Sequence, residues 1–458
     1  MTERTIPVQK NQNYIVDISG ITSEGYGVAR VEGFTVFVEG ALNSEQAEIR
    51  IIKVLKNYAY GKLLRILKPH TGRVEPSCGV VKRCGGCQLQ HMSYEAQLQY
   101  KTRQVKDAVE RIGGFKGVTV HDTIGMDNPW RYRNKAQFPV GMNGDVQIGF
   151  YANRSHAIID TPQCLIQDAI NDNVTRTVRE FIKKYDISIY NEDTGKGLIR
   201  HIVVRKAFRT GEVMVCIVVN GEDLPCIDAL IEMLRSSIDN LKSIVLNINK
   251  KRTNVVLGEK NIVVFGEEAI YDFIGEFKFR ISPLSFFQIN PVQTAVLYNK
   301  VLEYANLDGD EIVFDAYCGI GTISLFLSKR AKKVYGVEIV HQAIENAKEN
   351  AALNGVKNVE FIDGESETVI PELYAKGIKA DVIVVDPPRK GCDEKLLDAI
   401  AEMGPERVVY VSCNPATLAR DLKYLSERGY EIKVIQPVDM FPQTVHVECV
   451  TLMSKVEK

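Results

Sequence analysis

Long apolar segments are missing from this chain of 458 residues, and no run approaches the roughly 20 residues that a membrane-spanning helix requires. The segment from Met1 to Thr5 lacks the apolar core of a secretory signal peptide. Neither sign of charge is in excess, because the chain has 57 Lys and Arg residues and 58 Asp and Glu residues. This balance excludes a basic coat for nucleic acid but not a local basic face. We therefore expect a cytoplasmic protein without membrane contact.

Low-complexity segments and internal repeats are also absent, and the composition is that of a globular protein, with 45% hydrophobic and 25% charged residues. The length exceeds what one hydrophobic core supports, so we expect roughly two to four domains. In a reducing cytoplasm, ten cysteines are better explained as metal ligands, nucleophiles or core residues than as disulfides.

The N-terminal part, to about residue 66, contains short alternating strands separated by glycines. The clearest are Tyr14–Ile18, Gly27–Val31, Phe34–Val38 and Ala47–Ile52. Such strands with glycine turns predict a small closed barrel of five strands, of the OB kind. Cations then interleave with aromatic residues, which suits phosphate contact and base stacking but also an ordinary solvated strand face. These residues are Lys53, Lys56, Tyr58, Tyr60, Lys62 and Arg65.

The last third of the chain has the clearest periodicity. Apolar strands at 311–315, 334–338, 359–362, 381–385 and 407–411 alternate with helical segments. This alternation predicts a parallel, doubly wound α/β sheet. Residues 130 to 280 mix strand and helix patterns, which indicates a central α+β domain, and residues 94 to 113 form a charged helical pattern.

The first strand of the predicted sheet runs into a glycine loop, Asp315 to Gly321, that brings backbone close to a ligand. The second strand ends at Glu338, where an acid can hold ribose hydroxyls. The loop lacks the third glycine of a dinucleotide site, which favours S-adenosylmethionine. Asp363, at the end of the third strand, is either an adenine contact or a turn residue before Gly364.

Cys413 lies between an apolar strand and a helix, within Val411–Asp421. The dipeptide at 414–415 breaks the strand, and Thr417 suits the opening of the helix. A thiol beside a helix N-terminus can have its pKa lowered and attack an electrophile. A buried cysteine that ends a core strand is the alternative.

A thiol and a carboxylate together fit methylation of a pyrimidine at carbon. C5 of uracil accepts a methyl group only after a thiolate has added to C6, and a base must then remove the C5 proton. Cys413 supplies the thiol, and Glu448 is the expected base because partial burial would raise its pKa. His446 competes, since period-two alternation puts both on one strand face. Asp386, before two prolines, is expected to bind the uracil edge or the methionine part of the cofactor.

Over nearly its whole length, the sequence resembles the RNA uracil-5-methyltransferases, in particular the 23S ribosomal RNA branch. The segments that carry the resemblance are Ser285–Asn290, Asp315–Gly321, Asp386–Arg389, Ser412–Pro415 and His446–Cys449. The resemblance implies that Cys413 is the nucleophile and Glu448 the base. It also implies cofactor contacts by Gln288, Tyr317, Glu338 and Asp386. Either Phe286 or Phe287 stacks on a flipped base, or both pack in the core.

Three cysteines, Cys78, Cys84 and Cys87, are closely spaced, and Cys164 follows far away in sequence. Four thiolates fit a tetrahedral zinc ion or an iron–sulfur cluster, and the three-plus-one arrangement favours a cluster. The family resemblance implies a [4Fe-4S] cluster with Cys164 as its fourth ligand. We expect a structural or RNA-contacting role, because the methyl transfer requires no electrons. For the other cysteines, Cys216, Cys226, Cys318, Cys392 and Cys449, a core position is the default.

The resemblance extends to domain organisation. It implies a TRAM barrel at 5–66 that binds RNA, a central cluster-bearing domain at 69–92 and 126–275, and a class I methyltransferase domain at 93–125 and 276–458. We assign RNA contact to Trp130–Lys135 and to Arg200-His201, with a structural role as the alternative. No large target-recognition insert follows Cys413, so we expect no DNA substrate, and we expect a monomer.

The sequence therefore predicts S-adenosylmethionine-dependent methylation of uridine C5 in 23S ribosomal RNA through a covalent bond between Cys413 and C6. The product is 5-methyluridine, and the branch includes enzymes that modify one site and enzymes that modify two. A transfer-RNA enzyme with the same chemistry is one alternative. A non-catalytic iron–sulfur RNA-binding protein is the other, although intact Cys413, Glu448 and Asp386 argue against it.

Overall fold

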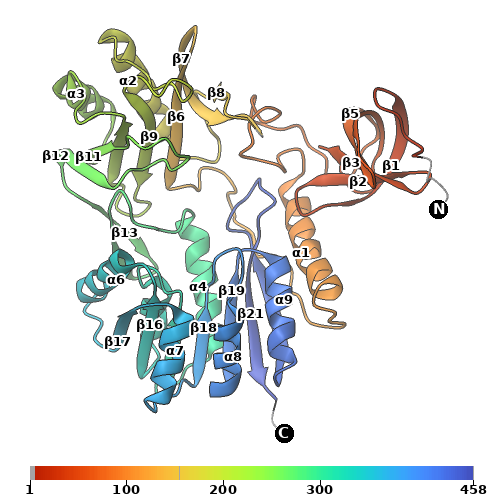
Figure 1. Cartoon of the computed structure of the whole chain (residues 1–458), viewed down its shortest axis with the longest axis vertical. Coiled ribbons are helices and arrows are strands. Elements are labelled where there is room, and N and C mark those ends of the chain that lie inside the picture. The colour runs from red at the N-terminus through yellow and green to blue at the C-terminus, as the bar shows by residue number, and fades with distance from the viewer. Residues whose placement is uncertain (1–5, 154, 457–458) are drawn as a thin grey trace.

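The computed structural model describes residues 6–153 and 155–456, arranged in three lobes (Figure 1). A small barrel forms one lobe, a mixed sheet with two helices forms the second, and a larger α/β sheet forms the third. The segment Met1 to Thr5 and the last two residues of the expected methyltransferase domain lie outside the described residues. Among the described residues, no helix has both the length and the hydropathy needed to cross a bilayer.

The first lobe confirms the predicted barrel. Its strands are β1 (Asn13–Ile21), β2 (Tyr26–Val31), β3 (Phe34–Glu39), β4 (Gln46–Val54) and β5 (Tyr58–Lys68). They close in the order β1-β2-β3-β5-β4. Alternate residues such as Val36 and Val38 point inward and are fully buried. Gly27 allows close packing, because a Cβ there would lie 2.8 Å from the Ala41 carbonyl oxygen.

The second lobe is a sheet of seven strands in the order β12-β11-β10-β9-β6-β7-β8. The strands are β6 (Lys135–Asn143), β7 (Asp145–Tyr151), β8 (Ile158–Asp160), β9 (Ile199–Lys206), β10 (Val213–Val219), β11 (Leu241–Ile248) and β12 (Lys260–Gly266). Helices α2 (Ile170–Lys184) and α3 (Ile227–Ser237) contribute to the hydrophobic cluster on this sheet. A short pair, β13 (Ile270–Ile274) and β14 (Phe277–Ile281), leads into the third lobe.

The third lobe confirms the doubly wound sheet, with strand order β17-β16-β15-β18-β19-β21-β20. Its parallel strands are β15 (Ile312–Ala316), β16 (Lys333–Glu338), β17 (Val359–Asp363), β18 (Val382–Val385) and β19 (Arg407–Ser412), each within one residue of its predicted range. The last two, β20 (Tyr430–Val438) and β21 (Glu448–Lys455), are antiparallel, and β21 pairs with β19.

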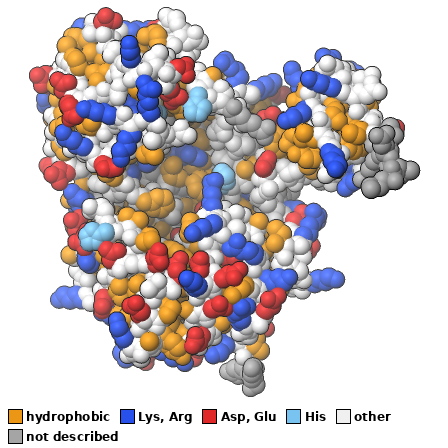
Figure 2. Space-filling view, in the orientation of Figure 1, with side chains coloured by type: hydrophobic (Ala, Val, Ile, Leu, Met, Phe, Trp, Pro, Cys, Tyr) orange, Lys and Arg blue, Asp and Glu red, His pale blue; other side chains and the backbone are white. Residues whose placement is uncertain are grey.

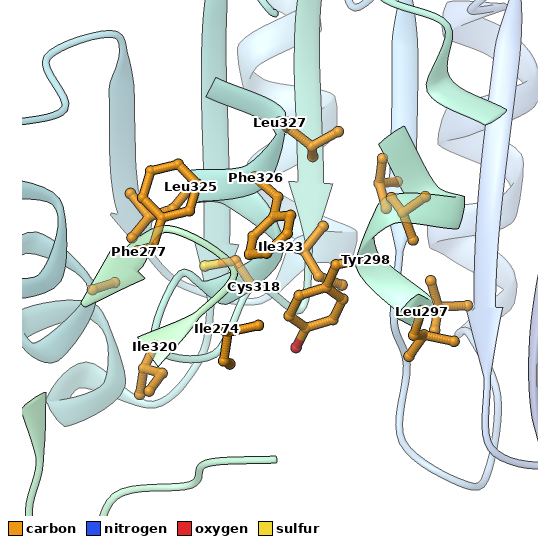
Figure 3. Packing of buried hydrophobic residues seen from close by; sticks show 14 of the residues in the cluster. Ile274, Phe277, Leu297, Tyr298, Cys318, Ile320, Ile323, Leu325, Phe326 and Leu327 are labelled. Carbon is orange, nitrogen blue, oxygen red and sulfur yellow. The ribbon is translucent and has the colours of Figure 1, made fainter. Parts of the chain in front are cut away.

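Helices cover both faces of this sheet. One face packs on α4 (Pro291–Ala305), α5 (Thr322–Ser328) and α6 (His341–Leu353). The other packs on α1 (Tyr94–Arg111), α7 (Ser366–Ala375), α8 (Glu394–Met403) and α9 (Pro415–Ser426). Figure 3 shows the first face, where Cys318 lies among Tyr298, Ile323 and Phe326, as expected of a core cysteine. The default core position also holds for Cys216, Cys392 and Cys449, whereas Cys226 is exposed.

Helix α9 begins earlier than predicted. Asn414 is its N-cap, and the Asn414 side chain accepts a hydrogen bond from the Ala416 amide at 3.0 Å. Pro415 occupies the first helical turn, where the missing N–H costs nothing. The residue before this cap is Cys413, so the thiol lies immediately before the helix N-terminus.

Candidate active site

A cavity of about 910 Å³ opens at the carboxyl ends of β15, β16, β18 and β19. Figure 2 shows the molecule hollowed between the second and third lobes, with hydrophobic side chains on the floor of the hollow. The predicted residues that line the cavity are Gln288, Tyr317, Glu338, Asp386, Cys413, His446 and Glu448. Because carboxyl ends of parallel strands meet at one sheet edge, residues far apart in sequence converge here.

Asp315 stabilises the start of the glycine loop. Its fully buried carboxylate accepts a hydrogen bond from Ser324 Oγ at 2.5 Å, and burial raises its pKa to about 7. Tyr317 has a φ of 65°, a conformation that is strained for a residue with a side chain. A Cβ on Gly319 would meet nothing within 4 Å, whereas one on Gly321 would lie 2.6 Å from Phe361. The loop is therefore packed on its sheet side and open on its cavity side.

Glu338 forms the rim beside this loop. One carboxylate oxygen accepts a hydrogen bond from the Gly319 amide at 3.2 Å, and the other accepts one from the Val340 amide at 2.9 Å. Asp363 ends the neighbouring strand but does not line the cavity. It is exposed, and its carboxylate lies 2.6 Å from His341 Nδ1. That position matches the turn-residue alternative, and its adenine contact stays a prediction.

The thiol and the carboxylate at the centre of the prediction come from adjacent strands. Strands β19 and β21 are antiparallel, and the last registered pair is Ser412 with Cys449. The next position along this register sets Cys413 opposite Glu448. Directly opposed residues of an antiparallel pair project to the same face, with Cβ atoms roughly 5 Å apart. Both side chains are half-buried and both line the cavity.

The expected lowering of the Cys413 pKa is wrong for the free enzyme. Burial raises the pKa of the Cys413 thiol to about 11, and the negative charges of Glu448 and Asp386 add to the rise. The positive charge of Arg389 opposes it. A helix N-terminus favours a thiolate, but here burial and two neighbouring carboxylates outweigh it.

The two competing bases differ in their proton affinity. Burial raises the pKa of Glu448 well above its usual range, with a further rise from Asp386. Burial and the nearby Arg389 lower the pKa of His446 to about 4. Strand alternation does not relate the two residues, because β21 begins at Glu448 and His446 precedes it. The group with the higher pKa takes up a proton more readily, so the electrostatics favour Glu448 over His446.

The turn that carries Asp386 is fastened to α9. The Arg389 carbonyl oxygen accepts hydrogen bonds from Asn414 Nδ2 and Thr417 Oγ1, both at 3.2 Å. Arg420 donates to the Lys390 carbonyl oxygen at 2.9 Å. These anchoring roles were not predicted from the sequence. The polar residues of α9 were the available signal, and they were interpreted only as the opening of a helix.

The structure separates the two adjacent phenylalanines. Phe287 is 5% exposed, and its ring centroid lies 5.9 Å from that of Phe279 in the core. Phe286 is 71% exposed and lines the cavity. An apolar ring left in a cavity is available for stacking, so only Phe286 remains a candidate for contact with a flipped base.

The four predicted cysteine ligands, Cys78, Cys84, Cys87 and Cys164, line one small cavity of about 150 Å³. Its backbone is fixed by neighbouring side chains, since Gln90 accepts from the Cys78 amide at 3.2 Å and Arg131 donates to the Cys164 carbonyl oxygen at 2.8 Å. Across residues 6–153 and 155–456, no three His, Cys, Asp or Glu side chains are arranged to hold a metal ion. The thiols thus share a cavity without converging on one point.

The predicted RNA contact by Arg200 and His201 is wrong. Both are buried, at 5% and 8% exposure. Arg200 donates hydrogen bonds to the Asn249 and Lys251 carbonyl oxygens at 2.6 and 2.9 Å. Within the other predicted segment, Tyr132 is also buried, but Arg133 faces a cavity.

The doubly wound sheet, its strand order and the glycine loop define an S-adenosylmethionine-dependent methyltransferase of class I fold. The family profile described as tRNA (Uracil-5-)-methyltransferase matches residues 230–456, and the TRAM domain profile matches residues 7–64. An uncharacterized RNA methyltransferase of Clostridium tetani is 57% identical over 99% of this chain and 98% of its own length. One of Bacillus cereus is 55% identical over the full length of both chains. The chain therefore belongs to the RNA uracil-5-methyltransferase family.

A solved structure agrees with this assignment. The tRNA (uracil-54, C5)-methyltransferase of Pyrococcus abyssi, in complex with S-adenosyl-L-homocysteine, has a TM-score of 0.78 and 28% identity. The match covers 96% of this chain and 100% of that one. The arrangement of barrel, central sheet and methyltransferase sheet is therefore shared with an enzyme of known structure.

Proposed function

We propose that the protein methylates C5 of uridine in 23S ribosomal RNA through a transient bond between Cys413 Sγ and C6 of the base. The observation that carries this proposal is the opposition of Cys413 and Glu448 across β19 and β21. A thiol and a base on neighbouring strand ends can act on the same ring, one at C6 and the other at C5. The 23S branch is favoured by the resemblance of the catalytic segments and by the four cysteines.

The residues that would hold S-adenosylmethionine fit that cofactor. The loop is open above Gly319, Glu338 lies at the ribose position of such folds, and Tyr317 supplies an aromatic wall. Asp386 carries a carboxylate whose pKa burial raises to about 6, so it is largely ionised at neutral pH and can attract a cationic group. When bound, S-adenosylmethionine supplies an electrophilic methyl group on a sulfonium.

The proposed reaction has three steps: addition of the thiolate, methyl transfer and elimination. The Cys413 thiolate forms an S–C6 bond, and the electron pair of the C5–C6 double bond moves into an enolate. C5 then forms a bond to the methyl carbon, and the carbon–sulfur bond of the donor breaks. Glu448 takes the proton from C5, the double bond reforms, and Cys413 leaves as a thiolate.

Charge couples the two residues, because Glu448 raises the pKa of the Cys413 thiol. Once sulfur is bonded to C6, it carries no negative charge beside the Glu448 carboxylate.

A transfer-RNA substrate is the second candidate. The matched structure from Pyrococcus abyssi is named as a tRNA enzyme, and it covers the barrel as well as the catalytic sheet. The two candidates are separated by incubating the enzyme with 23S ribosomal RNA fragments and with total tRNA, followed by mapping of 5-methyluridine. Methylation confined to tRNA would reject the 23S proposal while leaving the chemistry intact.

The covalent step has its own test. RNA with 5-fluorouridine at the mapped site lacks the C5 proton, so elimination fails and the adduct persists. We expect a protein–RNA band that survives denaturing electrophoresis with the wild type and is absent with Cys413→Ala. If no such band forms while ordinary RNA is methylated, the covalent route is wrong.

We further propose that Cys78, Cys84, Cys87 and Cys164 bind a [4Fe-4S] cluster. Support comes from their shared cavity of about 150 Å³ and from the three-plus-one spacing of the cysteines in the sequence, which favours a cluster over a zinc ion. Iron and sulfide analysis of anaerobically purified protein, together with its visible absorption, tests this. Stoichiometric zinc without sulfide would reject the cluster.

A further inference from the structure

A second pocket, of about 450 Å³, lies beside the proposed uridine site and shares a wall with it. The shared wall is the segment Ser285–Gln288 with Phe441, which lines both cavities. The opposite wall includes Lys135 and Gln137 of β6 and Arg133, two residues before the strand. Neither Cys413 nor Glu448 lines this pocket, so its occupant cannot be the reacting base.

The pocket is positively charged. Arg133 and Lys135 line it, and no Asp or Glu does. The alternation of β6 places Lys135 and Gln137 on one face, while Ala136 and Phe138 are buried on the other. Arg133, two residues before the strand, lines the same pocket. Two cations without an acid form a site for an anion such as a phosphodiester.

Within residues 6–153 and 155–456, neither cation pairs with a carboxylate. The Lys135 side chain has no hydrogen bond or ion pair there, whereas Lys206 on the adjacent strand binds Asp168 at 3.0 Å. Among the same residues, Arg133 donates a hydrogen bond to the Tyr132 hydroxyl at 3.5 Å and lies 6.0 Å over the Phe441 ring, but it contacts no carboxylate. A charged group kept in a cleft without a partner is costly unless a ligand supplies one.

Groups that can recognise a base line the same pocket. Phe286, 71% exposed, lies at the junction of the two cavities and offers a ring for stacking. Gln137 and Gln167 supply amides, and the side-chain oxygen of Gln167, a residue only 4% exposed, has no hydrogen-bond partner among the described residues. An unpaired buried acceptor is unusual in a folded protein and indicates a missing donor.

We infer that this pocket takes the nucleotide adjacent to the target uridine in the RNA chain, with its phosphate on Arg133 and Lys135 and its base against Phe286 and the two glutamines. The inference rests on the proposed function, and it adds a specificity-determining site to it. Methylation would then require two neighbouring nucleotides to leave their stack together. The identity of the second base, and not only that of the uridine, would select the substrate.

The test uses RNA in which one nucleotide next to the mapped uridine is replaced by an abasic residue. For the wild type, we expect the abasic change at one of the two flanking positions to lower kcat/KM by about ten-fold. For Gln137→Ala and Phe286→Ala, we expect kcat/KM on the intact RNA to fall and the abasic change to have little further effect. A purely structural role for these residues would lower kcat/KM but leave the abasic penalty in place.

Asn143→Ala is the matched control, since Asn143 is exposed at the far end of the same strand. For Asn143→Ala, the abasic change should lower kcat/KM as much as it does for the wild type. The inference is overturned if neither flanking abasic change affects the wild type, or if the penalty persists undiminished in both pocket variants. Methylation of the intact RNA by the wild type establishes the proposed function separately, so the two can fail independently.

Discussion

Cys413 and Glu448 face each other one position beyond Ser412 and Cys449, the last registered pair of β19 and β21. The pairing of the two strands brings these residues together, because Cys413 is the first residue after β19 and Glu448 is the first residue of β21. Strand β21 reaches its place only because it inserts antiparallel between β19 and β20. A site built on strand ends holds its groups more rigidly than one built on loops, which suits a reaction with two steps on one ring.

The first prediction concerns the nucleophile. We expect Cys413→Ala to abolish methyl transfer and to leave RNA affinity within a few-fold of the wild type, because the thiol is one small group in an extended contact. Filter binding at fixed salt and transfer of labelled methyl groups measure the two quantities. Cys226→Ala, a change at an exposed cysteine of the second lobe, is the control and should retain activity. Substantial methylation by Cys413→Ala would exclude the thiol as the nucleophile.

The second prediction concerns the base. In Glu448→Gln, sulfur addition and methyl transfer remain possible, but no group removes the C5 proton. We therefore expect a methylated protein–RNA adduct that accumulates and survives denaturing electrophoresis. Glu367→Gln, another carboxylate that lines the cavity, should release its product normally. Free enzyme with fully methylated RNA would show that another group acts as the base.

The third prediction follows from the Cys413 pKa. The thiolate is the reactive form, and Arg389 lowers the pKa of this thiol against burial and two carboxylates. Removing the cation raises the pKa further, so a smaller fraction is ionised at any given pH. We expect the rising limb of the single-turnover rate, measured from about pH 6 to 9, to move to higher pH in Arg389→Ala.

Two variants sharpen that measurement. Arg389→Lys keeps the charge and should stay close to the wild-type profile. Lys390→Ala removes a cation one residue away, which is not among the groups that shift the thiol, and should not move the limb. Superimposable profiles for Arg389→Ala and wild type would mean that Arg389 does not control ionisation of the thiol.

The sheet and the residues at its strand ends were predictable from sequence. Five apolar runs alternate with helices, and the carboxyl ends of parallel strands must share an edge, which brings Tyr317, Glu338, Asp386 and Cys413 together. The relation between His446 and Glu448 was not predictable in this way. Alternation applies only inside a strand, and where β21 begins depends on its pairing with β19.

Contacts between residues far apart in sequence were also not predictable from the sequence. Lys101 on α1 is fully buried and forms an ion pair with Asp439 at 2.5 Å, although 338 residues separate them in sequence. A lysine in a charged helix predicts solvent exposure, and only the folded structure reveals its partner. The Cys413 pKa was mispredicted for the same reason, because burial raises it and the carboxylates that add to the rise lie far away in sequence, one after β18 and one at the start of β21.

The fourth prediction tests that buried ion pair. Lys101 also donates to the Phe441 carbonyl oxygen at 3.1 Å, so it anchors the segment that leads to Glu448. We expect Lys101→Met to leave a buried carboxylate unpaired and to lower the free energy of unfolding by about 3–5 kcal/mol in urea denaturation. Hydrogen exchange at residues 443–448 should also increase.

Arg103→Met is the matched control on the same helix. Arg103 pairs with Asp107 at 2.8 Å, but its side chain is 69% exposed, so the expected cost is below about 1 kcal/mol. The double variant Lys101→Met with Asp439→Asn should recover part of the lost free energy of unfolding, because no buried charge is then left unpaired. Equal costs for Lys101→Met and Arg103→Met would contradict an anchoring role for the buried pair.

The fifth prediction uses the two adjacent phenylalanines as each other's control. Phe287 is packed in the core, and truncation to Ala should cost about 3–5 kcal/mol of stability. Phe286 is 71% exposed, so Phe286→Ala should leave the urea midpoint nearly unchanged. The order should reverse for RNA, with Phe286→Ala weakening binding about ten-fold through lost base stacking. Binding measured well below the melting temperature of both variants separates the two effects, and unchanged RNA affinity in Phe286→Ala would remove this ring from the RNA contact.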